Sequence, residues 1–289
     1  MERFGYVKAA SIGDAVTLLN EPGLKSRPLA GGTDILLQLR HEPHYCDRLV
    51  DISQLSDLHR IEQKDGWVHI GAAATFSEVL DSPIISETAP VLTQACATVG
   101  AVQIRNMGTL GGNVANAAAC ADSLPALVCL DAIATLLSPT GEQEIPVSQF
   151  VTGPNRTSLP TGGLLISIRY PVPAEGSRSA FLKLGRRNAM AISRLTVAAL
   201  GRLDANNLIV EARLVSGSAT PHIERLGTVE QTLIGKQPTP ELYQHAANVT
   251  VDEMIRLAGY RWSSEFKVPA LTAMTQRVFE QIFNHGEAR

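Results

Sequence analysis

Residues 109–122 read TLGGNVANAAACAD and combine short hydrogen-bonding side chains with very small ones. Such a segment can neither fill a core nor form a charged surface, so we expect its backbone to approach another group closely. Its two glycines remove the Cβ atoms where that approach would be tightest. The pattern predicts a ligand-binding loop, with candidate contacts at Thr109, Gly111, Gly112, Asn113, Asn116 and Asp122.

A second glycine pair lies far upstream, again followed by Thr and Asp at the start of an apolar helical pattern. Thr33 or Asp34 could cap that helix, so free backbone N–H groups and the positive end of the helix dipole would face the loop. An anion such as a diphosphate is the guest that this arrangement favours. One glycine pair alone is more simply an ordinary tight turn, but two pairs suggest main-chain amides that converge on one pyrophosphate. The residues of this first loop are Leu29, Ala30, Gly31, Gly32, Thr33, Asp34, Ile35 and Leu36.

Neither loop matches the two best-known phosphate motifs. The chain has no Gly-Lys-Ser/Thr ending of a P-loop, which argues against nucleoside triphosphate hydrolysis. It has no Gly-x-Gly-x-x-Gly either, so a dinucleotide would have to be held by two separated loops. No Ser/His/Asp or Cys/His arrangement suits a nucleophilic mechanism, and we name no catalytic residue.

The cysteines and histidines do not predict a metal site. The four cysteines contain no Cys-x-x-Cys pair, so we expect reduced and mainly buried thiols. The HEPHYC segment at 41–46 has neither the spacing of a closed metal site nor a fourth ligand nearby.

The elements that position these loops begin with a small α/β unit. Polar and apolar spacing predicts helices over 11–19 and 35–39 and strands over 27–30 and 48–52. This strand–loop–helix–strand order is typical of parallel strands.

Further along, the pattern predicts a mixture of strands and helices. We expect strands at 67–71 and 164–170, helices at 76–80, 90–99 and 124–130, and a hairpin of strands 135–138 and 143–146. A Pro- and Gly-rich linker near 171–177 places a domain boundary at about residue 176. Beyond it we expect antiparallel strands at 180–187, 195–203 and 208–216, then helices at 222–234, 239–258 and 268–284.

Bulk properties narrow the class of protein. The 289 residues are 45% hydrophobic and 18% charged, which is typical of a globular protein. A net charge of −3 gives no basic field for nucleic acid or an anionic membrane. The N-terminus lacks a signal-peptide pattern and no apolar run reaches membrane-spanning length, so we expect a cytoplasmic protein.

The motifs LAGGTDILLQL and QIRNMGTLGGNVANAAACADS resemble the two diphosphate-binding stretches in the FAD-carrying medium subunits of molybdenum hydroxylases. The resemblance runs nearly end to end and is closest to the bacterial xanthine dehydrogenase branch. It implies an α+β fold, with a PCMH or vanillyl-alcohol-oxidase-type FAD-binding domain at 1–176. That domain would have two α/β subdomains, at about 1–57 and 58–176. A C-terminal domain with a three-stranded antiparallel sheet and helices would occupy 177–289.

The resemblance also implies a function. FAD would take electrons from iron–sulfur clusters in a small partner subunit and pass them to NAD, while a large partner holds molybdopterin. We expect a dimer of such heterotrimers. Two other classes stay open, namely a non-redox nucleotide-binding or assembly module that has kept the phosphate loops, and a stand-alone flavin oxidoreductase, for which no acid or base is evident.

Three single residues are carried over from the family. The resemblance places Asp122 at the adenosine ribose, Ile166 against the cofactor and Lys183 near the flavin ring. The alternatives are a helix cap for Asp122, strand packing for Ile166 and a solvated face for Lys183. The pair Arg186–Arg187 could dock NAD or a partner, although solvated arginines are the simpler reading.

Overall fold

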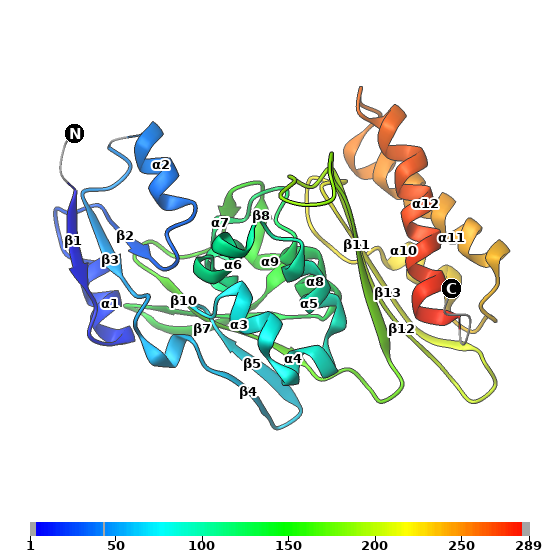
Figure 1. The fold of residues 1–289 in the computed structure, drawn as a ribbon, viewed down its shortest axis with the longest axis horizontal. Coiled ribbons are helices and arrows are strands. Elements are labelled where there is room, and N and C mark those ends of the chain that lie inside the picture. The colour runs from blue at the N-terminus through cyan, green and yellow to red at the C-terminus, as the bar shows by residue number, and fades with distance from the viewer. Residues whose placement is uncertain (1–3, 43, 285–289) are drawn as a thin grey trace.

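The computed structural model describes residues 4–42 and 44–284, arranged as three units in a row (Figure 1). The first unit is a parallel sheet in the order β1-β3-β2, with the α/β character that the sequence predicted. Ser11 caps the helix that follows the first strand, since its side chain accepts from the amide of Asp14. The elements are β1 (Gly5–Lys8), α1 (Ile12–Leu19), β2 (Ser26–Leu29), α2 (Ile35–His41) and β3 (Arg48–Asp51).

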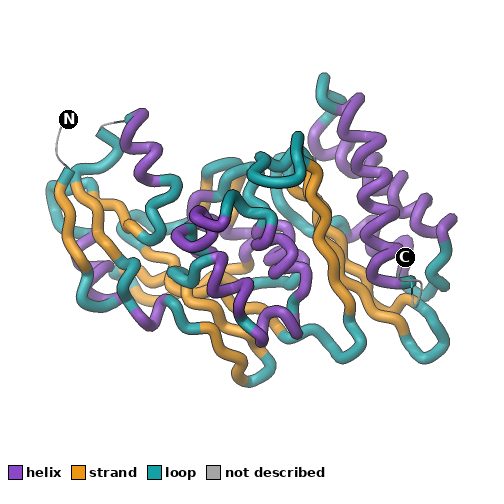
Figure 2. The backbone as a smooth tube through the Cα atoms, viewed as in Figure 1, coloured by secondary structure: helices purple, strands orange, loops and turns teal. Residues whose placement is uncertain are grey.

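The second unit is a five-stranded antiparallel sheet in the order β4-β5-β10-β6-β7, with helices packed over it (Figure 2). The strands are β4 (Ile61–Lys64), β5 (Trp67–Gly71), β6 (Ile133–Ser138), β7 (Gly141–Pro146) and β10 (Leu164–Pro171), and a small ladder joins β8 (Val151–Gly153) to β9 (Arg156–Thr157). The helices are η1 (Ser56–Leu58), α3 (Phe76–Asp81), α4 (Pro83–Thr88), α5 (Pro90–Ala97), α6 (Val102–Met107), α7 (Leu110–Asn116), α8 (Ser123–Cys129) and α9 (Val147–Phe150).

The small-residue stretch is more regular than predicted. We expected a loop over 109–122, but α7 occupies its first half. Thr109 caps this helix by accepting from the amide of Gly112, and Leu110 and Val114, four residues apart, are both buried. These local signals outweigh the low helix propensity of the two glycines.

The third unit has the predicted three antiparallel strands, β11 (Arg178–Leu184), β12 (Leu195–Leu203) and β13 (Ile209–Gly217). Three helices follow, α10 (Gly227–Leu233), α11 (Pro240–Ala258) and α12 (Ser264–Phe283). The last helix begins four residues before the predicted start at 268, because Pro269 is accommodated inside it. The elements β1, η1, β4, α4, α6, α7, α9, β8 and β9 were not predicted.

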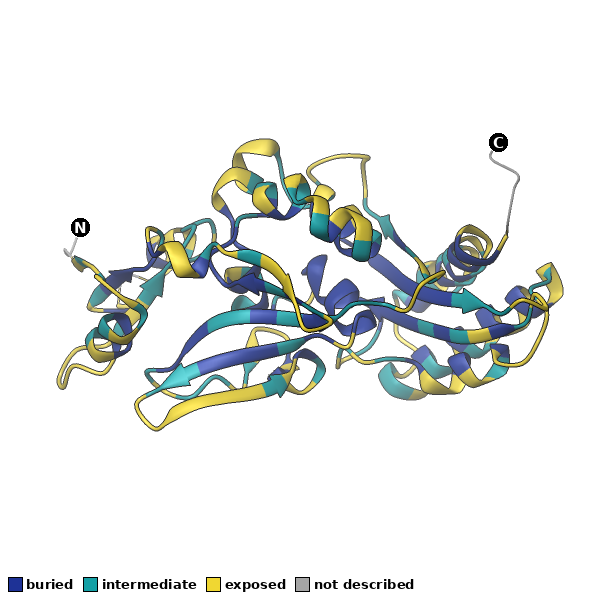
Figure 3. Cartoon of the chain, turned by 90° about the horizontal axis from the view of Figure 1, so that it is seen from below, coloured by how far each residue is buried: buried dark blue, intermediate teal, exposed yellow. Residues whose placement is uncertain are grey.

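The central strand of the C-terminal sheet, β12, is buried from Leu195 to Gly201 (Figure 3), and apolar residues pack on both faces of the sheet. One face packs on α11 and α12, while the other joins the core of the second unit through Phe181, Ala198, Leu200 and Val215. The second and third units therefore share one apolar core. Within the part of the chain that the structure describes, no helix is both long and apolar enough to cross a membrane.

Candidate functional site

A cleft of about 1050 Å³ lies between the first and second units. It is lined by most of the first predicted loop, from Ala30 to Ile35. Residues of the central stretch line it as well, namely Thr109, Gly111, Gly112, Asn113, Ala115, Asn116 and Ala118. The volume is that of a site for a large ligand.

The two glycine turns touch through their main chains. A Cβ atom on Gly31 would lie 1.7 Å from the carbonyl oxygen of Met107 and 3.0 Å from Cα of Gly108, so only glycine permits this contact. Gly108 in turn accepts a hydrogen bond from the amide of Phe76 at 3.0 Å. Turns that are remote in the sequence thus form adjoining parts of one cleft.

The first turn keeps its amides available. Among the described residues, the backbone N–H groups from Gly31 to Ile35 donate to no protein acceptor. Gly32 has φ of +74°, in the left-handed region that favours glycine, which lets successive amides turn toward the cleft. Asp34 stands at the N-cap position of α2, but its side chain makes no capping hydrogen bond. The turn is therefore a ready set of donors for an anion.

The second turn uses its amides within the protein. The N–H of Gly111 donates to the carbonyl of Ala72 at 3.0 Å, and that of Gly112 donates to Thr109 Oγ1 at 3.0 Å. A Cβ on Gly111 would also clash with Ala72, 2.5 Å away. The expectation that both turns present main-chain amides is therefore wrong for this one, because helix capping and sheet contacts occupy the donors.

Side chains take the place of those amides at the second turn. Asn113 Oδ1 accepts from Ser123 Oγ at 2.7 Å, so the amide nitrogen of this side chain remains for a ligand. Asn116 also lines the cleft and is half-buried. The second turn can thus donate to an anion through two carboxamides.

Two further features of the cleft were not predicted. Lys25 and Arg27 flank the ring of Tyr45, with their cationic atoms 5.7 and 5.1 Å from its centre, and all three residues line the cleft. They place positive charge and an aromatic face along the wall. The only sequence signal was two basic residues, Lys25 just before β2 and Arg27 within it.

A third glycine pair closes another side of the cleft. Gly162 has φ of +67°, and its carbonyl accepts from Asn20 Nδ2 at 2.9 Å, which joins the first unit to the second. A Cβ on Gly162 would lie 1.9 Å from Asn20 Oδ1. The motif Thr-Gly-Gly at 161–163 was available in the sequence, but it lacked the helical pattern that follows the other pairs.

Asp122, Ile166 and Lys183 are not among the residues that line the cleft. Ile166 lies at a bulge in β10, where its carbonyl accepts from the amide of Ala72 at 3.0 Å. Lys183 Nζ donates to Asp122 Oδ2 at 2.5 Å in a buried ion pair. Their assignment to the cofactor stays a prediction.

The four cysteine thiols are buried or half-buried. Cys46, Cys96 and Cys129 are buried as predicted, and Cys120 is half-buried. Burial raises the pKa of all four thiols, which keeps them protonated and unreactive. Among residues 4–42 and 44–284, no group of three or more His, Cys, Asp or Glu side chains is placed to hold a metal ion.

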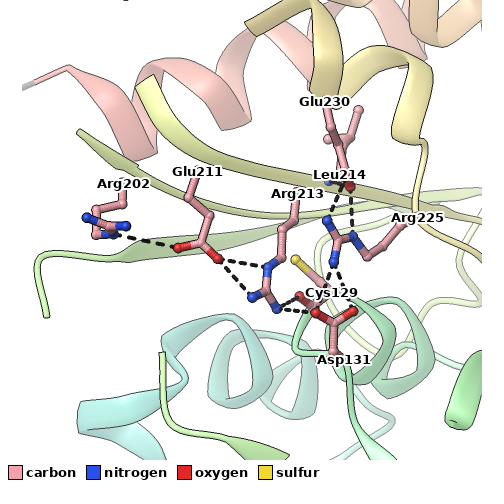
Figure 4. A network of polar contacts seen from close by, with 8 residues as sticks. All are labelled: Cys129, Asp131, Arg202, Glu211, Arg213, Leu214, Arg225 and Glu230. Carbon is pink, nitrogen blue, oxygen red and sulfur yellow. Dashed lines mark hydrogen bonds and ion pairs between the residues drawn. The ribbon is translucent and has the colours of Figure 1, made fainter. Parts of the chain in front are cut away.

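An ion-pair network crosses the junction between the second and third units (Figure 4). Asp131, just beyond the end of α8, binds Arg213 at 2.8 Å and Arg225 at 2.9 Å. Arg225 also binds Glu230 of α10 at 2.7 Å. The junction is therefore held by charge as well as by the shared core.

Comparison with known families gives two matches that together span most of the chain. Residues 2–173 match the FAD binding domain in molybdopterin dehydrogenase. Residues 180–282 match the CO dehydrogenase flavoprotein C-terminal domain.

Relatives and solved structures agree with these matches. The chain is 34% identical to a putative xanthine dehydrogenase FAD-binding subunit of Escherichia coli, over 96% of this chain and 94% of that one. It is 27% identical to the carbon monoxide dehydrogenase medium chain of Hydrogenophaga pseudoflava, over 99% and 98%. A structure of carbon monoxide dehydrogenase from the same organism superposes with a TM-score of 0.89 at 26% identity, covering 96% of each chain. Quinoline 2-oxidoreductase from Pseudomonas putida gives 0.90 at 25% identity, covering 97% of each.

Proposed function

The chain belongs to the family of FAD-binding subunits of molybdopterin-dependent dehydrogenases, and from this premise we propose that it holds FAD in the cleft between its first and second units. There it would serve as the electron-transfer subunit of a xanthine-dehydrogenase-like molybdenum hydroxylase. The observation that carries the proposal is the run of unpaired amides from Gly31 to Ile35, set in a cleft of about 1050 Å³.

The residues present fit a dinucleotide diphosphate. The first turn supplies backbone donors, Asn113 and Asn116 supply side-chain donors, and Lys25 and Arg27 add positive charge. Three glycine pairs that are separate in the sequence line the cleft. When bound, FAD would supply the exchange between one-electron and hydride transfer, while the protein positions it and excludes competing reactions.

We propose that electrons reach this subunit from iron–sulfur clusters of a small partner and leave to NAD. A large partner with molybdopterin would oxidise the substrate, in a cytoplasmic dimer of heterotrimers. The relatives support a multi-subunit complex, because several are named as medium chains or FAD subunits. The proposed site residues remain those of the two motifs, together with Asp122, Ile166 and Lys183.

The purified chain tests the proposal directly. We expect bound flavin, visible by its absorbance, and FAD-dependent oxidation of NADH with an artificial acceptor. Gly112→Val should abolish flavin retention, because the branched side chain would enter the cleft. The protein atom nearest to a Cβ at this position is Thr109 Oγ1, at 2.7 Å. Gly227→Val is the matched control, since a Cβ at that position has no neighbour within 4 Å.

The alternative is a non-redox nucleotide-binding or assembly module. A colourless wild-type protein that takes up no FAD but still binds ADP would favour that reading. Full FAD occupancy in Gly112→Val would instead show that the phosphate assignment of the second turn is wrong.

A further inference from the structure

The carboxylate of Asp122 receives donors from three parts of the chain. Oδ2 accepts from Lys183 Nζ at 2.5 Å and from Thr98 Oγ1 at 3.2 Å, and Oδ1 accepts from Ser193 Oγ. The side chains of Asp122 and Lys183 are 6% and 12% exposed. A buried carboxylate with this many donors holds its partners in fixed positions.

Two of those donors lie at the two ends of one loop. The loop between β11 and β12 covers residues 185–194, so Lys183 precedes it and Ser193 is near its end. The amide of Arg194 also donates to the carbonyl of Leu184 at 2.8 Å, which closes the base of the loop. One carboxylate from the second unit thus fastens both ends of a loop from the third unit.

The rest of this loop is exposed. Met190 and Ile192 are 58% and 77% exposed, and Arg186 and Arg187 are also on the surface. The Arg187 guanidinium donates to the carbonyl of Met190 at 2.6 Å, which folds the tip onto itself. At the end of the loop, Arg194 also packs over the ring of Phe266 in α12, 5.5 Å from its centre, so the loop is anchored mainly at its base.

A short path of bonded groups joins this loop to the cleft. Asn113 lines the cleft and accepts from Ser123 Oγ at 2.7 Å, and Ser123 follows Asp122 in the chain. A ligand that fixes Asn113 therefore acts on the segment that carries the carboxylate. Such a contiguous arrangement can carry energetic coupling, which is reciprocal between the two ends.

We propose that Asp122 is a positioning residue that couples occupation of the cofactor cleft to the order of the 185–194 loop. The coupling rests on the proposed function, because it requires FAD to bind beside Asn113. Attachment of the loop to Asp122 does not depend on the ligand.

Limited trypsin digestion of the full chain tests both parts, because Arg186 and Arg187 are cleavage sites within the loop. Mass spectrometry would give the rate of cleavage there, relative to cleavage at exposed Lys64, which ends β4 next to the turn between β4 and β5. Without FAD, Asp122→Ala should raise the relative rate about tenfold or more, since the base of the loop is released. Ser193→Ala keeps the ion pair and should give a smaller increase.

Asp131→Ala is the matched control, because this aspartate lies at the other end of α8 and binds Arg213 and Arg225 rather than the loop. Its loop cleavage should match that of wild type. Saturating FAD should slow loop cleavage in wild type several-fold and to a smaller extent in Ser193→Ala, which keeps Asp122 as a proposed cofactor contact. In Asp122→Ala, compared at FAD concentrations where flavin fluorescence shows binding, FAD should not slow loop cleavage.

The outcomes separate the two parts. Wild-type cleavage rates in both Asp122→Ala and Ser193→Ala would overturn the attachment, and Ser193→Ala decides if Asp122→Ala does not fold. Equal protection by FAD in wild type and in the Ser193→Ala and Asp122→Ala variants that fold would overturn the coupling. If wild type binds no FAD, the proposed function and the coupling fail together, while the ligand-free comparison still tests the attachment.

Discussion

Gly31 has no room for a side chain, because the carbonyl of Met107 occupies the place of its Cβ. The contact is between two main chains, so it cannot be relieved by rotating a side chain. This one position therefore ties the first glycine turn to the second. The free amides that begin at Gly31 are held facing the cleft by that contact.

Gly31→Ala should therefore separate the turns and lower FAD affinity by at least about tenfold, a loss of about 1.4 kcal/mol or more of binding free energy. Flavin occupancy and titration of the apoprotein with FAD would measure it. Gly13→Ala is the control in the same unit, since a Cβ there lies 3.9 Å from its nearest neighbour and α1 gains a better helix former. Unchanged affinity in Gly31→Ala would show that the contact between the turns does not shape the site.

At the scale of elements, α1 and the segment before β10 meet across the cleft through Asn20 and Gly162. The Asn20 side chain donates to the carbonyl of Gly162 at 2.9 Å and to that of Val16 at 2.7 Å. It thus ends α1 and connects the first unit to the second. The contact therefore holds together two elements that border the cleft.

Asn20→Ala removes both hydrogen bonds, and the one to Gly162 is the one that joins the two units. The net value of that bond is about 0.5–1.5 kcal/mol, so FAD should dissociate about twofold to tenfold faster. Stopped-flow release of flavin into excess apoflavoprotein scavenger would give the rate. Asn248→Ala, at an exposed position of α11 far from the cleft, should leave the rate unchanged. An unchanged rate in Asn20→Ala would mean that the cleft opens elsewhere.

The helix α8 connects the units in a different way. All seven of its residues are buried, and an aspartate stands at each end. Asp122 binds Lys183 before the helix, and Asp131 binds Arg213 and Arg225 after it (Figure 4). Both sets of cations come from the third unit, so α8 fixes that unit against the cleft-forming one.

At the scale of the whole molecule, one apolar core extends across the domain boundary that was predicted near residue 176. Phe181, Ala198, Leu200 and Val215 belong to the same apolar cluster as the helices of the second unit. Loss of the third unit would expose that cluster to water. The two parts are therefore expected to depend on each other for stability.

Thermal unfolding of the chain should show one cooperative transition for the second and third units, with calorimetric and van't Hoff enthalpies close to each other. FAD should raise the midpoint, because it binds only the folded chain. Differential scanning calorimetry with and without FAD would measure both. Two well-separated transitions, one of them insensitive to FAD, would contradict the shared core.

Much of the architecture followed from local patterns. The glycine pairs, the capping residues and the alternating strands depend on neighbours within a few positions, so the parallel pair β2 and β3 of the first unit and the three C-terminal strands were predicted correctly, while β1 was missed. The family motifs were readable for the same reason. Short helices such as α4, α6 and α9 were missed because a single turn of apolar residues carries little periodicity.

Only the tertiary structure decided which polar groups are free. The amides of both glycine turns look equivalent in sequence, yet Ala72 and Thr109 occupy those of the second turn while those of the first stay open. Likewise, nothing near Asp122 in the sequence indicates that Lys183 and Ser193 bind it. The sequence determines which hydrogen bonds each residue can donate or accept, but long-range packing determines which partner lies close enough to form them.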